Sequence, residues 1–256
     1  SMLNTYDDLK IIGEDAFKGC TSLGTLILSK NLTTISKGAF EGCSKITFLD
    51  IPGSVTSIGD GAFAGSGIRQ VYFLGDVTTK GKDVFNGCAR LETVIFKEGT
   101  TAISDGMFRG CTSLKSIELP IGLRFIGDGA FEGCISLKTI DLPKGLESIG
   151  DNAFERSGLT SVTIPDGVKM IAFHVFLDCV DLESLTLPTS VDIIQLSALQ
   201  GCSNLKEITI PDGVSTISED AFKGCTSLVR IYAGAGLIQI DPGAFGDIRF
   251  YTLGGV

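Results

Sequence analysis

The nine residues from Ile126 to Cys134 read Ile-Gly-Asp-Gly-Ala-Phe-Glu-Gly-Cys, and variants of this phrase return along the whole chain. A repeat this short is too small to enclose a core, so each unit has to bury its apolar side against the next one. Its aromatic position recurs every 22 or 23 residues, at Phe17, Phe40, Phe63, Phe85, Phe108, Phe131, Phe154, Phe176, Leu199, Phe222 and Phe245. The sequence therefore predicts an α/β solenoid of about eleven coils.

Each unit also predicts its own local structure. Leu114–Pro120 alternates apolar and polar residues like a half-buried strand, and its proline ends the strand because it has no N–H to donate. Leu123 and Ile126 then return the chain across the other face, Gly127–Gly129 turns it, and Ala130–Cys134 is interpreted as one helical turn. We expect a right-handed arc with a parallel inner sheet. Helical turns on its convex side would be wider than the strands and would curve it.

The domain organisation follows from the uninterrupted repeat. We expect residues 1–256 to form a single domain, in which residues 1–22 are a partial first repeat and residues 246–256 an irregular C-terminal end. Two units have 22 residues, and their missing residue is predicted to lie in the outer turn, at Gly65–Gly67 and Arg156–Gly158. A deletion there leaves the register of the sheet unchanged.

Eight cysteines lie three residues after the aromatic position, and Ser66 or Ser157 takes their place in the two short units. A residue that recurs once per coil points the same way in every coil, so these side chains form a parallel column instead of converging as a disulfide requires. We therefore predict buried, unpaired thiols that pack as small apolar groups. Metal binding is disfavoured, because the chain has no Cys-x-x-Cys pair and only one histidine.

The formal net charge of −9 disfavours nucleic acid and anionic membranes as partners, since both require clustered basic residues. No apolar run reaches the roughly 18 residues that a membrane-spanning helix needs, so membrane insertion is not expected. The N-terminal residues carry no basic segment followed by an apolar one, so no signal peptide is predicted in this chain.

The repeated pattern Leu-x-x-Ile-x-Leu-Pro-x-x-Leu-x-x-Ile-Gly-x-x-Ala-Phe-x-x-Cys resembles the BspA-like, Treponema-type leucine-rich repeats over nearly the whole chain. The resemblance implies an arc with a parallel inner sheet, and a cell-surface or secreted protein that attaches to host proteins or other cells. The sequence departs from the pattern at Leu199, at Met170–His174 and from Ile248 onward.

Two sets of polar residues are candidates for other chemistry. His174 stands on an outer turn, but hydrolysis would need a nucleophile and an orienting carboxylate around it, so a surface or packing role is favoured. Acidic residues at the start of the outer turns are interpreted as helix caps, because calcium would need several oxygen ligands in one short loop. These residues are Asp60, Asp128, Asp151 and Asp220. No catalytic residue, metal or cofactor is predicted, and the protein is not expected to be an enzyme.

The outward positions of the inner sheet are the ones whose chemistry changes from coil to coil. Large apolar side chains gather toward the N-terminal end, and an acidic rim beside them would steer a basic partner. Aromatic residues also favour strands without any binding role, so ordinary strand propensity stays open as an explanation. The candidate protein-binding residues on this concave face are Ile27, Phe48, Asp50, Arg69, Tyr72, Ile95, Lys115, Glu118 and Asp141.

Two functions from different classes fit the sequence. The first is an extracellular or cell-surface module that holds a protein ligand, such as a host matrix or surface protein, on the concave sheet. The alternative is an intracellular scaffold in the cytoplasm, because a reducing compartment tolerates eight unpaired thiols best.

Overall fold

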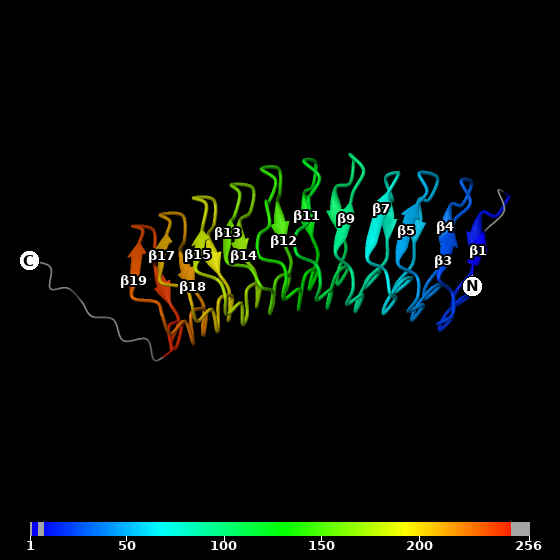
Figure 1. Ribbon diagram of the computed structural model, residues 1–256. Helices are drawn as coiled ribbons and strands as arrows, with labels where there is room; N and C mark the ends of the chain where they lie inside the picture. Colours follow the sequence, from blue (N-terminus) through cyan, green and yellow to red (C-terminus); the bar gives the residue numbers. More distant parts are fainter. Residues whose placement is uncertain (1, 5–7, 247–256) are drawn as a thin grey trace, which may run out of the picture.

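The structure, a computed structural model, describes residues 2–4 and 8–246. The chain winds into a parallel β-solenoid of about ten turns, and most turns contribute two short strands (Figure 1). The first set, called here the long strands, comprises β1 (Met2–Asn4), β3 (Thr25–Ile27), β5 (Phe48–Ile51), β7 (Gln70–Phe73), β9 (Thr93–Ile95), β13 (Ser161–Thr163), β15 (Ser184–Thr186), β17 (Glu207–Ile210) and β19 (Arg230–Ala233). The return strands are β2 (Ile11–Ile12), β4 (Thr34–Ile35), β6 (Ser57–Ile58), β8 (Thr79–Lys80), β10 (Ala102–Ile103), β11 (Phe125–Ile126), β12 (Ser148–Ile149), β14 (Met170–Ile171), β16 (Ile193–Ile194), β18 (Thr216–Ile217) and β20 (Gln239–Ile240).

All strand pairs are parallel and join equivalent positions of successive coils. Among the long strands, Asp50 of β5 lies opposite Tyr72 of β7, which in turn lies opposite Ile95 of β9. Between β9 and β13, two coils continue the same face without regular strand pairing. Their Ile117 and Ile140 are still buried, so the alternation of inward and outward side chains persists through them.

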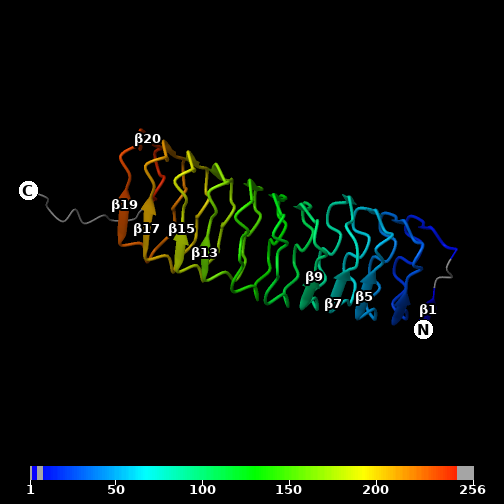
Figure 2. The same cartoon turned by 90° about the horizontal axis from the view of Figure 1, so that it is seen from above.

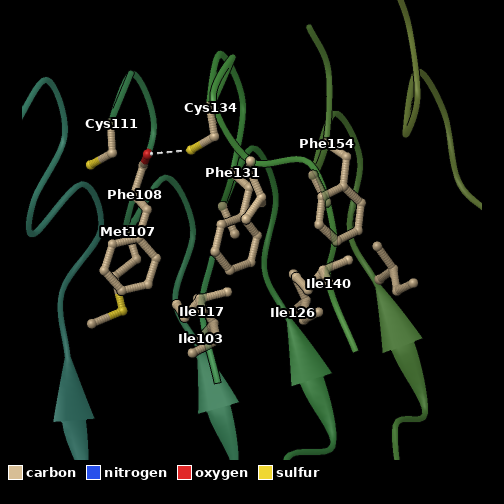
Figure 3. Close-up of a cluster of buried hydrophobic side chains, with 14 of the residues drawn as sticks. Ile103, Met107, Phe108, Cys111, Ile117, Ile126, Phe131, Cys134, Ile140 and Phe154 are labelled. Carbon is tan, nitrogen blue, oxygen red and sulfur yellow. Dashed lines mark hydrogen bonds between the residues drawn. The ribbon is translucent and has the colours of Figure 1, made fainter. Parts of the chain in front are cut away.

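The core is a set of columns in which the same residue type lies above its equivalent in the next coil. Phe131 and its equivalents from Phe40 to Phe176 have no exposed surface, and neighbouring rings stack with centroids 5.1–5.9 Å apart along the column (Figure 3). Leu199 occupies the same slot, fully buried, and interrupts the aromatic column. Each ring therefore depends on two neighbouring coils for its burial, as the repeat predicts.

The thiol column is confirmed. Cys134 donates its S–H to the carbonyl of Phe108 in the preceding coil at 3.1 Å (Figure 3). Every other buried cysteine repeats this contact. All eight cysteines are unpaired, and burial raises the pKa of the Cys134 thiol to about 12. Only Cys20 is exposed, because no described coil lies before it.

The predicted helical turns on the outer side are wrong, since the described part of the chain contains no helix. Positive φ angles at Gly129 (59°) and Gly133 (70°) flank the turn and prevent a helix from propagating. The N–H of Phe131 donates to Ala153 of the next coil at 2.8 Å instead of to a residue one turn earlier. The outer side is thus a series of turns joined to their neighbours by backbone hydrogen bonds.

This bonding also changes the expected curvature. Because backbone hydrogen bonds set the spacing of the coils on the outer side as well as in the sheets, neither side is much wider than the other. The molecule is an elongated, gently arched stack instead of a tight horseshoe (Figures 1 and 2). The outward side of the long strands is therefore called the strand face below, without reference to concavity.

Glycines in the turns have two different roles. Gly129 supplies a positive φ, as predicted, but Gly127 does not. A Cβ on Gly127 would lie 2.6 Å from the backbone nitrogen of Asp105, so this glycine allows two coils to approach closely.

The missing residue of each short coil falls in the segment where the sequence predicts it. In the first short coil, the return strands pair at a spacing of 23 before the deletion and the long strands at 22 after it. In the second, Glu147 bonds to Arg124 at a spacing of 23, whereas Thr160 bonds to Lys138 at a spacing of 22. The predicted irregular C-terminal end lies, from residue 247 onward, outside the described residues.

Candidate protein-binding surface

The candidate residues reach the surface because side chains alternate along each long strand. In β5, Leu49 and Ile51 point into the core, whereas Phe48 and Asp50 point outward. The same alternation exposes Ile27 on β3 and Ile95 on β9 and leaves Tyr72 on β7 half-buried. A one-residue shift in register would reverse both sets, so the buried column also fixes which side chains are presented.

Four apolar side chains form what we call the N-terminal patch: Ile27, Phe48, Tyr72 and Ile95. Ile27, Phe48 and Ile95 keep 47%, 46% and 45% of their surface exposed. The rings of Phe48 and Tyr72 lie 5.4 Å apart, tilted by 38°, so the patch is continuous across β5 and β7. The aromatic and aliphatic residues that the sequence placed here are thus brought together.

A shallow groove of about 430 Å³ runs beside this patch. Ile27, Phe48 and Asp50 line it together with Leu28, Pro52 and Leu74. Leu74 was not among the predicted residues. It is 54% exposed and stands 22 residues after Pro52, where other coils carry the proline that ends the strand. An apolar residue in place of this proline is the sequence signal from which this wall of the groove could have been predicted.

The acidic candidates do not all lie on a rim. Asp50 lies within the N-terminal patch, between Ile27 of the preceding coil and Tyr72 of the next one. Glu118 and Asp141 are exposed and follow Ile95 along the same column, so they border the patch on one side. Negative charge therefore reaches both the middle and one edge of the apolar surface.

The two basic candidates differ in their surroundings. Arg69 forms an ion pair with Glu92 of the next coil at 2.6 Å, so its charge is largely offset. Glu92 was absent from the predicted site, although it stands 23 residues after Arg69 in the same outward column. Lys115 is exposed, and none of the ion pairs between described residues includes it. Surface ion pairs of this kind add little stability, but they change the field that a partner meets.

The rest of the strand face has a different character. Thr163 of β13 lies opposite Thr186 of β15, and both are exposed. These small polar residues and Asp141 line a second groove of about 670 Å³ that has no aromatic lining. Among the described residues of this face, large apolar exposure returns in the last coil, at Val229 and at Tyr232 of β19. The apolar candidate residues therefore concentrate over the first coils of the strand face.

The other candidate residues show structural roles. His174 adopts a positive φ of 55° at the position of Gly129, its ring stacks on Phe173, and its Nδ1 lies 3.4 Å from the side-chain nitrogen of Asn152. Asp128, interpreted as a helix cap, instead accepts the backbone N–H of Asp151 in the next coil at 2.9 Å. Residues 2–4 and 8–246 contain no cluster of potential metal ligands and no helix suited to crossing a membrane.

Comparisons with known proteins agree with this architecture. Residues 2–115 and 124–250 match the model of the BspA-type leucine-rich repeat region. A leucine-rich repeat protein from Bacteroides ovatus is 27% identical, with a TM-score of 0.67 over 94% of this chain and 74% of that one. The leucine-rich repeat protein of T. pallidum is 29% identical, with a TM-score of 0.51 over 68% of this chain and 72% of that one.

A leucine-rich cell surface protein from Faecalibacterium prausnitzii shares the fold at 23% identity, with a TM-score of 0.53 over 91% of this chain and 72% of that one. No curated protein matches the sequence. The family model covers nearly all of the stacked coils, and the aromatic, thiol and glycine columns explain why its pattern recurs. The chain belongs to the BspA-type leucine-rich repeat family.

Proposed function

We propose that this protein is a non-enzymatic binding module, displayed at the cell surface or secreted, that holds a protein ligand on its strand face. The observation that carries the proposal is the N-terminal patch, where Phe48 and Tyr72 are in contact and lie beside exposed Ile27 and Ile95. Exposed aromatic and aliphatic residues flanked by charge resemble the centre of a protein–protein interface. The ligand class that fits the family is a host matrix or surface protein.

The location outside the cell is supported by the relative from Faecalibacterium prausnitzii, which is described as a cell surface protein. The main argument for the cytoplasmic alternative was the set of unpaired thiols. Seven of the eight cysteines are buried, and burial raises the pKa of Cys88 to about 11 and that of Cys225 to about 12. Thiols held in the neutral form react slowly with oxidants and disulfides, so they are compatible with an oxidising environment as well.

The proposal is tested by measuring binding to a panel of purified extracellular-matrix proteins by surface plasmon resonance. For any protein of the panel that binds the wild type, Phe48→Ala and Tyr72→Ala should each weaken binding at least about tenfold, because anchors at the centre of an interface carry most of its affinity. Phe125→Ala is the matched control, since Phe125 is 43% exposed but lies on return strand β11. Unchanged binding by both strand-face variants, or an equal loss in the control, contradicts the proposal.

A further inference from the structure

We infer that the groove beside β5 recognises a basic residue of the ligand flanked by apolar residues, and that Asp50 is the group that selects it. This inference rests on the proposed protein-binding function and specifies the chemistry of the bound segment. It depends on the position of one carboxylate inside an apolar surface, on the charges around it and on the shape of the groove.

The outward neighbours of Asp50 in its column and on its own strand are uncharged. Ile27 and Tyr72 lie on either side of it in the column, and Phe48 precedes it on the same face of β5. The carboxylate is exposed to water in the free protein. A ligand that covers the N-terminal patch would remove this water, and an unpaired carboxylate left in an apolar interface is strongly unfavourable. The ligand therefore has to provide a cation at this point.

In the part of the chain that the structure describes, no ion pair includes Asp50. Arg69 is engaged with Glu92, and Lys30 lines the groove without an ion pair to Asp50. Farther along the column, Glu118 and Asp141 add negative charge. The field over this part of the strand face therefore attracts a basic segment and orients it toward the groove.

The walls of the groove define what flanks the cation. Leu74, Ile27 and Phe48 present large apolar surfaces around Asp50. They favour aliphatic or aromatic neighbours in the ligand, and the tilted rings of Phe48 and Tyr72 also offer faces on which a guanidinium group can lie. Selection works in both directions: a wholly apolar ligand would bury Asp50 unpaired, whereas an acidic one would be repelled.

The test uses a random dodecapeptide library displayed on phage and selected on the immobilised full chain. Enriched peptides should contain arginine or lysine next to an aromatic or large aliphatic residue. A synthetic copy of the most enriched peptide should bind Asp50→Asn at least about tenfold more weakly than the wild type. Glu219→Gln makes the same charge change in an exposed outer turn, outside the strand face, and should bind within about twofold of the wild type.

The outcomes separate this inference from the proposed function. Enriched peptides without a basic residue, equal binding by Asp50→Asn, or a library that yields no binder would each overturn the inference. If the peptide loses affinity for Phe48→Ala but not for Asp50→Asn, the N-terminal patch binds ligands and only the role of Asp50 is wrong. If neither variant loses affinity, both the inference and the strand-face site are wrong.

Discussion

The core columns and the strand face are built from the same coils but follow opposite rules. In the core, Phe131 and Cys134 occupy slots that most other coils fill with the same residue type, and both are completely buried. On the strand face, the successive residues of one column are Ile27, Asp50 and Tyr72. Stacking requires a repeated shape, whereas exposed positions carry no such requirement, so the variable column is where recognition can be encoded.

The largest expected effect on the core columns is the loss of stability at alkaline pH. Burial raises the pKa of six well-buried thiols above the ordinary value of 9.0, to about 12 for Cys179. These thiols ionise less readily in the folded state than in the unfolded state. The stability that they contribute to the fold is therefore fully present below about pH 9 and is lost as the pH rises through about 12. Each such thiol lowers the free energy of unfolding by about 1.4 kcal/mol per pH unit in this window, so the fold should unfold there. The six are Cys88, Cys111, Cys134, Cys179, Cys202 and Cys225.

Urea unfolding followed by circular dichroism at about pH 8 and about pH 10 measures this slope. The matched variant carries Cys111→Ala and Cys134→Ala together, and its stability should depend less on pH by the contribution of two thiols. The same pH dependence in the variant and the wild type would show that other groups govern alkaline unfolding.

Phe131→Ala tests one slot of the aromatic column. It should lower the free energy of unfolding by about 3–5 kcal/mol, because the cavity it leaves is shared by two neighbouring coils. Urea unfolding gives the value. Phe48→Ala removes the same side chain from the strand face and should change stability by no more than about 1 kcal/mol. Equal losses in the two variants would remove the distinction between core columns and strand face.

Gly127→Ala tests the close approach of the coils. Its Cβ would lie 2.6 Å from the nitrogen of Asp105, so the coils have to separate locally, at a cost of about 1–3 kcal/mol. Gly13 occupies the same repeat position in the first coil, where no atom lies within 4 Å of the added Cβ. Gly13→Ala should therefore leave the thermal midpoint nearly unchanged, and a similar loss in both variants would point to backbone conformation instead of crowding.

Tyr72→Ala should have only a small effect on stability, within about 1 kcal/mol, because its side chain is only half-buried. The measurement is again urea unfolding, made on the same preparation used for binding. A loss as large as that of Phe131→Ala would mean that Tyr72 belongs to the core, and its effect on binding would then report a damaged fold.

Most of the fold was predictable because the pattern of apolar residues and cysteines in the sequence is periodic. The spacing of Phe17 to Phe245 predicted the stacked coils, and the position of the cysteines predicted unpaired buried thiols. The outer turn was not predictable in the same way. Residues 130–134 resemble a helical turn locally, but the positive φ angles at Gly129 and Gly133 and the bonds to the next coil produce another structure.

The candidate site was predictable in composition but not in arrangement. Alternation along the strands identified the outward residues, including Phe48 and Tyr72. The groove formed with Leu74, the pairing of Arg69 with Glu92 and the place of Asp50 inside the patch all involve residues of different coils. Contacts of this kind depend on how far apart two coils lie and in which direction their side chains extend.

The sequence by itself determined that apolar positions recur at one interval. A unit of that length is too short to enclose a core of its own, so the units can bury their apolar residues only by stacking. It also determined which positions vary between coils. The tertiary structure alone decided the form of the outer turns, the gentle bend and the surroundings of Asp50. The physical reason is that a repeat specifies what each coil must bury, whereas hydrogen bonds and contacts between coils specify how the coils are spaced and what they present together.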